Sequence, residues 1–186
     1  MIPEITQAAC TILGAYGEAT ADGKLYHLRA LDWMPRAYVN QYPSVIIYES
    51  SEEGSKPFAN IGYLGLLGSL TAISKIGISV GEKVFYALDP ADYPIAPKIT
   101  YFGKPWMFVL RDTVQFANNI NDAQSMLQGA QRTMMIHLGI GSLPDKTFRG
   151  VDYASNFITF YNDQNYTHYS VAHPQHNGIF YYDKLI

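Results

Sequence analysis

The order of secondary-structure patterns limits the fold of this chain more than any other feature of its sequence. Short apolar segments joined by turn residues fill the first 85 residues, two helical patterns follow, and strand patterns then return. Strands joined by short turns pair as antiparallel neighbours, and helices must bury their apolar faces against such a sheet. The sequence therefore predicts an α+β domain of two stacked, mainly antiparallel sheets with covering helices.

The expected elements have recognisable limits. The strands are expected at residues 24–30, 45–48, 58–63, 66–73, 76–80, 133–138, 148–153, 157–161 and 178–182. Pro105 opens the first helical pattern, because proline is tolerated in the first turn of a helix. The second helix is expected over 122–131, where Asn121 and Asp122 are suitable capping residues.

A hairpin is predicted near the N-terminus. Residues 8–20 are small and apolar, and Asp22-Gly23 follows them as a turn signal. On the returning strand Leu25, His27 and Arg29 share one face, since side chains alternate along a strand. This geometry brings Arg29 back toward the region of Cys10.

Cys10 is the only cysteine of the chain, so it has no disulfide partner within it. A lone cysteine is most often a small buried apolar residue. It acts as a nucleophile when an electropositive neighbour favours the thiolate. Arg29, 19 residues downstream, can supply that charge, and Asp32 can hold the arginine or an amine in place.

These residues carry a family resemblance. The matching segments are Cys10-Thr11, Tyr16-Gly17, residues 19–25 (ATADGKL) and residues 29–33 (RALDW). Together they resemble the opening of the N-terminal-nucleophile hydrolases, above all the penicillin acyltransferase family and its phospholipase B-like relatives. Choloylglycine hydrolase and acid ceramidase are more distant relatives with a similar pattern. Weaker similarities at 65–79, 105–112, 132–141 and 173–184 extend the match over nearly the whole chain.

The resemblance implies an α-β-β-α sandwich and a self-processing enzyme. The precursor would cut itself between Ala9 and Cys10, so that residues 1–9 are a propeptide and residues 10–186 form the domain. Cys10 would then carry both the attacking sulfur and a free α-amine, which can serve as its own base near neutral pH. The implied reaction is acyl transfer from a small amide or acyl conjugate through a thioester, without a cofactor.

The resemblance also suggests roles for individual residues. Asp32 would hold the α-amine, Arg29 would polarise the thiol, and Asn165 would stabilise the oxyanion, with Asn156 as the second choice. Ala30 departs from the pattern, because asparagine is common there in the related families. Asn165 also begins an Asn-Tyr-Thr glycosylation sequon, and a glycosylated side chain could not serve an oxyanion.

The edge of the substrate pocket is a further implication of the resemblance. Trp33 and Glu82 would border it. From the residues alone, Glu82-Lys83 after Gly81 is most simply a solvated turn.

Composition and spacing argue against several other functions. A net charge of −3 without a basic cluster gives no footprint for nucleic acid, and no apolar run is long enough to span a membrane. The segment around Glu4 has no basic start, so no signal peptide is predicted in this chain. The sequence leaves the compartment open: lysosomal or secreted if the N-terminus is truncated, and otherwise cytoplasmic.

Metal and dinucleotide sites are not predicted either. His168, His173 and His176 lack the cysteine or clustered acid that would complete a zinc site. The Gly139-x-Gly141 pair lacks the third glycine of a dinucleotide-binding loop. His137 is interpreted as a packed core residue.

Two alternatives stay open on the sequence. One is an inactive or truncated relative with a structural or binding role, since the chain stops just after a predicted strand and lacks the asparagine at Ala30. The other is a phospholipase B-like lipid acyl hydrolase, which shares the nucleophile and differs in substrate. The oligomeric state is not specified.

Overall fold

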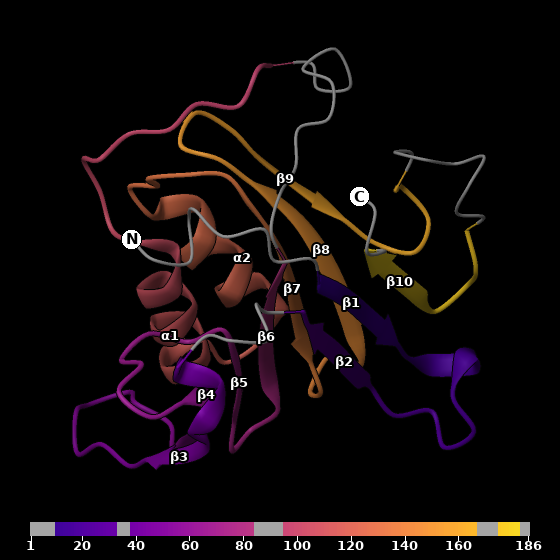
Figure 1. Ribbon diagram of the computed structural model, residues 1–186. Coiled ribbons are helices and arrows are strands. Elements are labelled where there is room, and N and C mark those ends of the chain that lie inside the picture. Colours follow the sequence, from indigo (N-terminus) through magenta and orange to yellow (C-terminus); the bar gives the residue numbers. More distant parts are fainter. Residues whose placement is uncertain (1–9, 33–37, 84–94, 167–174, 183–186) are drawn as a thin grey trace.

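The computed structural model describes residues 10–32, 38–83, 95–166 and 175–182, and these form two antiparallel sheets and two α-helices (Figure 1). The small sheet has the strand order β10-β1-β2, and the large sheet runs in order from β3 to β9. The strands are β1 (Cys10–Ala15), β2 (Tyr26–Leu31), β3 (Pro43–Tyr48), β4 (Phe58–Tyr63), β5 (Thr71–Ser74), β6 (Ile78–Lys83), β7 (Ile136–Ser142), β8 (Thr147–Tyr153), β9 (Ile158–Tyr161) and β10 (Ile179–Tyr182). The helices are α1 (Trp106–Phe116) and α2 (Ile120–Gly129), and short 3-10 turns lie at Gly17–Ala19 and Tyr38–Gln41.

Most predicted elements are present. Many of their limits differ by a few residues, and three of these differences have a clear local reason. The strand expected from residue 66 begins only at Thr71, because a turn at Gly65 (φ +87°) occupies the preceding residues. Pro105 is the N-cap of α1 and lies one residue before it. Asn119 caps α2, accepting a hydrogen bond from the Asp122 N–H, so this helix begins two residues earlier than expected.

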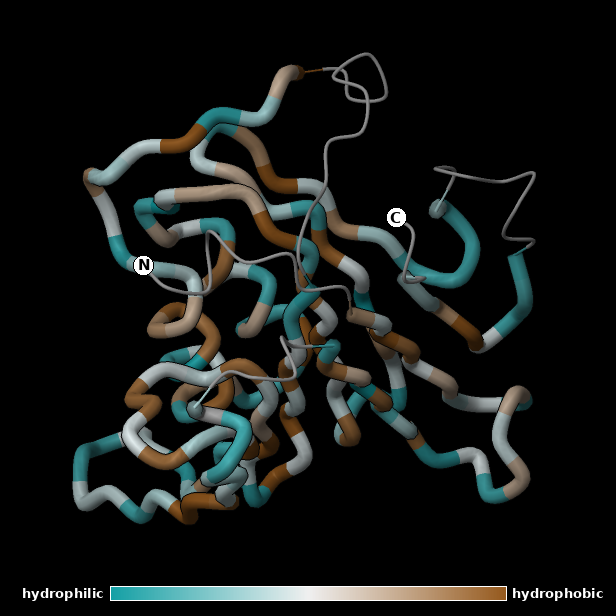
Figure 2. The backbone as a smooth tube through the Cα atoms, in the orientation of Figure 1, coloured by the Kyte–Doolittle hydropathy of each residue, from teal (hydrophilic) through white to brown (hydrophobic). Residues whose placement is uncertain are grey.

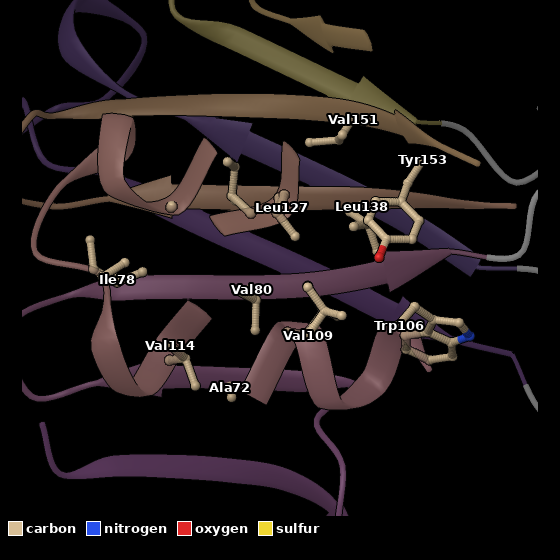
Figure 3. Close-up of a cluster of buried hydrophobic side chains, with 14 of the residues drawn as sticks. Ala72, Ile78, Val80, Trp106, Val109, Val114, Leu127, Leu138, Val151 and Tyr153 are labelled. Atoms are coloured by element: carbon tan, nitrogen blue, oxygen red, sulfur yellow. The ribbon is translucent and has the colours of Figure 1, made fainter. Parts of the chain in front are cut away.

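The two helices and the small sheet lie on opposite faces of the large sheet. Apolar side chains of α1 and α2 meet those of β5 to β8 in the main core (Figure 3), which includes Val80, Val109, Leu127 and Leu138. A second cluster, mainly aromatic, fills the layer between the two sheets. Hydrophobic positions recur along the strands and both helices (Figure 2). The α+β prediction of stacked antiparallel sheets with covering helices is therefore confirmed.

A row of glycines brings the two sheets close together. Gly81, Gly139 and Gly150 are register neighbours on β6, β7 and β8. A Cβ atom built on Gly150 would lie 1.9 Å from Cζ of Phe180 on β10. A Cβ atom on Gly139 would lie 2.7 Å from Cγ2 of Ile12 on β1. The side chains of the small sheet therefore rest directly on the backbone of the large sheet.

Gly150→Ala should destabilise the protein by about 1–3 kcal/mol, because the added methyl overlaps a fully enclosed ring. Urea-induced unfolding measures the change. Gly129→Ala is the matched control: it lies at the end of α2 with open space around it, and alanine favours the helix. Equal stability of the Gly150→Ala variant and the wild type would show that the sheets can separate without cost.

Candidate active site

Cys10 begins β1 and points into the layer between the sheets, where it is fully buried. β1 pairs with β2 on one side and with β10 on the other, so this residue starts the central strand of the small sheet. The predicted hairpin has formed, with Cys10 opposite Leu31 and Ile12 opposite Arg29. The alternation of β2 directs His27 and Arg29 inward, as the sequence indicates.

Arg29 contacts the thiol of Cys10 and connects it to residues of the large sheet. Its Nη2 donates to Cys10 Sγ at 3.7 Å and also to the carboxylate of Glu82. Its Nε donates to the Glu82 carbonyl oxygen at 3.0 Å, and its Nη1 lies 3.5 Å from Thr71 Oγ1. The side chain is only 4% exposed. A buried guanidinium next to sulfur favours the thiolate over the thiol.

Glu82 belongs to β6, and the interpretation of Glu82-Lys83 as a solvated turn is wrong. The Glu82 side chain is 5% exposed and lies against Arg29. Burial raises the pKa of Glu82, while the charges of Arg29 and Lys83 act to lower it. The carboxylate thus fixes the guanidinium from the side of the large sheet.

Two residues that the sequence analysis did not single out lie near this cluster. Tyr63, at the end of β4, is close enough for the charges of Cys10 and Arg29 to influence it; burial is the larger effect and raises its pKa. Thr71 supplies the hydroxyl next to Arg29. Neither has a sequence signal, because each arrives through strand pairings that join distant segments.

His27 lies two residues before Arg29, and its Nδ1 forms a 2.9 Å hydrogen bond with Ser79 Oγ. Burial, and then the charge of Arg29, lower the pKa of His27 to about 4. The imidazole is therefore neutral at pH 7 and packs edge-on against Phe148, with ring centroids 4.8 Å apart.

The stability of the protein should fall as the pH drops from about 6.5 to about 4. The unfolded chain binds a proton on His27 near pH 6.5, whereas the folded protein does so only near pH 4, so the loss from this residue reaches about 3 kcal/mol. Urea unfolding of wild type and His27→Gln across this range isolates the contribution, since carboxyl groups titrate in both. Parallel curves for the two proteins would contradict the assignment.

The remaining predicted site residues are placed as follows. Asp32 follows β2 directly and is partly buried. Ala9 and Trp33 lie outside the described residues, and so does the proposed propeptide 1–9. The roles of Asp32 and Trp33, and cleavage before Cys10, stay predictions.

The two asparagines proposed for the oxyanion are engaged elsewhere in this structure. Asn165 is exposed in a turn, where its Oδ1 accepts from the Asn162 N–H at 2.6 Å. Asn156 binds the segment 96–98: its Oδ1 accepts from the Lys98 N–H, and its Nδ2 donates to the Ala96 carbonyl. The structure brings neither of them to Arg29, and their oxyanion role stays a prediction.

A groove of about 290 Å³ runs along the inner face of the large sheet beside β2. Its polar wall includes His27, Thr71 and Ser79, and Thr71 connects the groove to Arg29. The rest of its wall is mainly apolar and is formed by Leu25, Ile61, Ala72, Ile73, Gly77, Val80 and Leu143.

Within the described residues, neither helix has the length and hydrophobicity of a membrane span.

No family model matches the sequence, but individual proteins are similar to it. Protein dcd1A of Dictyostelium discoideum is 31% identical over 197 residues, covering 100% of this chain and 43% of dcd1A. Protein dcd1B of the same organism is 30% identical over 188 residues, covering 99% and 36% respectively. An uncharacterized protein of Archaeoglobus fulgidus is 24% identical over 124 residues, covering 67% and 19%. The chain thus spans less than half the length of the curated relatives it matches.

Two solved structures share the fold. The N-acylethanolamine-hydrolyzing acid amidase ortholog of Caenorhabditis elegans superposes with a TM-score of 0.59 at 14% identity, covering 94% of this chain and 70% of the amidase. A mutant of the conjugated bile acid hydrolase of Clostridium perfringens gives 0.54 at 11% identity, covering 83% and 51%. At these identities the likeness establishes the fold alone, which is a sandwich of two antiparallel sheets with covering helices.

Proposed function

We propose that this chain is the nucleophile-bearing part of a self-processing cysteine amidohydrolase or acyltransferase that acts on a small acyl amide. The observation that carries the proposal is the contact between Arg29 Nη2 and Cys10 Sγ, at 3.7 Å in a buried setting. The two solved structures with this fold are an acid amidase and a bile acid hydrolase, and both names fit amide chemistry.

In the proposed reaction Cys10 supplies both sulfur and base. After cleavage of the Ala9–Cys10 bond, the α-amine takes the proton of the thiol, and the thiolate is stabilised by Arg29. The sulfur attacks the amide carbon, a C–S bond forms, and the electron pair of the carbonyl moves to oxygen. The oxyanion collapses, the C–N bond breaks, and the leaving amine accepts the proton from the ammonium group. Water, or another nucleophile, then releases the acyl group from the thioester.

Two carboxylates have separate roles in the proposed reaction: Glu82 acts on Arg29, and Asp32 acts on the α-amine of Cys10. Glu82 holds the guanidinium in place through two contacts, so that Arg29 approaches the sulfur in one defined orientation. Asp32 comes directly after β2, whose last residue Leu31 lies opposite Cys10. In the proposal Asp32 orients the α-amine.

The proposal is tested by finding the first residue of the mature protein and trapping the acyl-enzyme. Mass spectrometry should show a chain that begins at Cys10, and incubation with a chromogenic acyl amide should add the acyl mass to a peptide containing it. A hydroxylamine-sensitive adduct identifies a thioester. An intact N-terminus together with no adduct would favour the inactive relative, and turnover of ester phospholipids alone would favour the lipid hydrolase.

A further inference from the structure

A row of ionisable side chains lies in the layer between the two sheets, next to the glycine row. Residues two positions apart on a strand point to the same face of the sheet. The residues two positions from the row glycines, in the direction away from the turns that join the strands at the other end, are Lys83, His137 and Asp152. These three are register neighbours on β6, β7 and β8, and none is more than 1% exposed. Buried charges at this density are unusual in a sheet interface and call for a role.

The same step on the small sheet leads to the residues that oppose this row. From the side chains that rest on the glycines, it reaches Arg29 on β2, Cys10 on β1 and Tyr182 on β10. These three do not form one register row: Ile12 on β1 is the partner of both Arg29 and Tyr182, and Cys10 lies one such step further along β1. The thiol therefore lies one same-face step from the strand positions of Arg29 and Tyr182, and both of these side chains contact the large sheet.

Tyr182 joins the two layers on the β10 side. Its hydroxyl donates to Asp152 Oδ1 at 2.9 Å, and its ring lies 4.4 Å from that of His137. His137 Nδ1 donates to the same carboxylate oxygen at 2.7 Å. Tyr161 on β9 also hydrogen-bonds to Asp152. Burial, with the charge of Asp152 adding to it, raises the pKa of Tyr182 well above its ordinary value, so the hydroxyl keeps its proton and remains a donor.

Polar contacts between the sheets thus come from both strands that flank β1. On β2, Arg29 reaches Glu82 of the large sheet, and on β10, Tyr182 reaches Asp152. Apolar residues of the same volume generally stabilise such an interface at least as well as buried ionic groups do. What a satisfied buried network adds is one defined geometry.

We propose that His137, Asp152 and Tyr182 are positioning residues for the nucleophile. They fix β1 from the β10 side, as the Arg29–Glu82 pair fixes it from the β2 side. The role rests on the proposed function, because it takes the thiol as the reacting group. Removing the Tyr182 hydroxyl loosens β1 and lengthens the contact between the thiol and the guanidinium.

The test follows the ionisation of the thiol directly. Because Cys10 is the only cysteine, ¹³C labelling at cysteine Cβ gives a single resonance whose shift reports thiol and thiolate across pH. In Tyr182→Phe the midpoint should rise by about one pH unit, which lowers the ratio of thiolate to thiol about tenfold at any given pH. Tyr153→Phe is the matched control, since Tyr153 is also a fully buried tyrosine but lies on β8 of the large sheet and packs in the main core, on the side of the helices.

Catalysis gives a second readout. Tyr182→Phe should lower kcat by about 10-fold to 100-fold with little change in KM, the pattern of a misplaced reacting group. An unchanged midpoint in Tyr182→Phe, or an equal shift in Tyr153→Phe, overturns the proposal. If Tyr182→Phe does not fold, the titration of His137→Gln decides in the same way. A wild type that neither processes itself nor hydrolyses an amide refutes the proposed function, while the cysteine titration still tests the positioning role.

Discussion

Replacing Cys10 by alanine is expected to lower amide hydrolysis by at least about 10⁴-fold, because removal of a nucleophile leaves only binding and oxyanion stabilisation. The same variant should remain uncut before residue 10. The change removes one sulfur atom from a buried position, so the fold should persist. Steady-state kinetics and intact-mass measurement check both parts.

Cys10→Ser is the informative companion. Serine keeps a nucleophilic atom, but its hydroxyl has a far higher pKa than a thiol, so Arg29 cannot hold it ionised near neutral pH. Slow or absent processing with an unchanged melting temperature is expected. Full activity in the alanine variant would show that the reacting group lies elsewhere in the chain.

Breaking the pair of Arg29 and Glu82 is expected to destabilise the protein by about 3–5 kcal/mol, because either single change leaves an unpaired charge in a buried site. Arg29→Met and Glu82→Leu are the two single variants. The double variant should lose less than the sum of the two, since it leaves no charge unpaired. Urea unfolding of all four proteins provides the cycle.

A surface pair serves as the control for this prediction. Lys104 and Asp112 also form an ion pair, but their side chains are 47% and 37% exposed. Lys104→Met should change stability little, because water solvates the remaining carboxylate. Additive effects in the Arg29 and Glu82 cycle would mean that the two groups do not stabilise each other.

The sequence predicted individual strands and turns better than it predicted which strands pair with one another. The strand over 58–63 has the predicted limits, and the Asp22-Gly23 hairpin formed as expected, because both depend on local alternation and turn chemistry. The pairing of β1 with β10 joins the two ends of the described chain, and no local pattern encodes it.

In the candidate site, too, contacts within one hairpin could be predicted and contacts between distant strands could not. Arg29 could be placed near Cys10, since one hairpin connects them. Glu82 looked like a solvated turn because a charged pair after a glycine usually is one; only the inward arginine of another strand explains its burial. His137 was interpreted as a core residue and is buried, but its contact with Asp152 depends on strand register, which the sequence does not reveal.

The pairing of β1 with β10 has a consequence for the timing of synthesis. A growing chain leaves the ribosome from its N-terminal end, so β1 and β2 can form their hairpin long before β10 exists. Until then β1 has one edge open, and Tyr182 has not yet joined Asp152. The surroundings of Cys10 are therefore completed only when β10, the last described strand, has emerged, and any chemistry that depends on them has to wait for that strand.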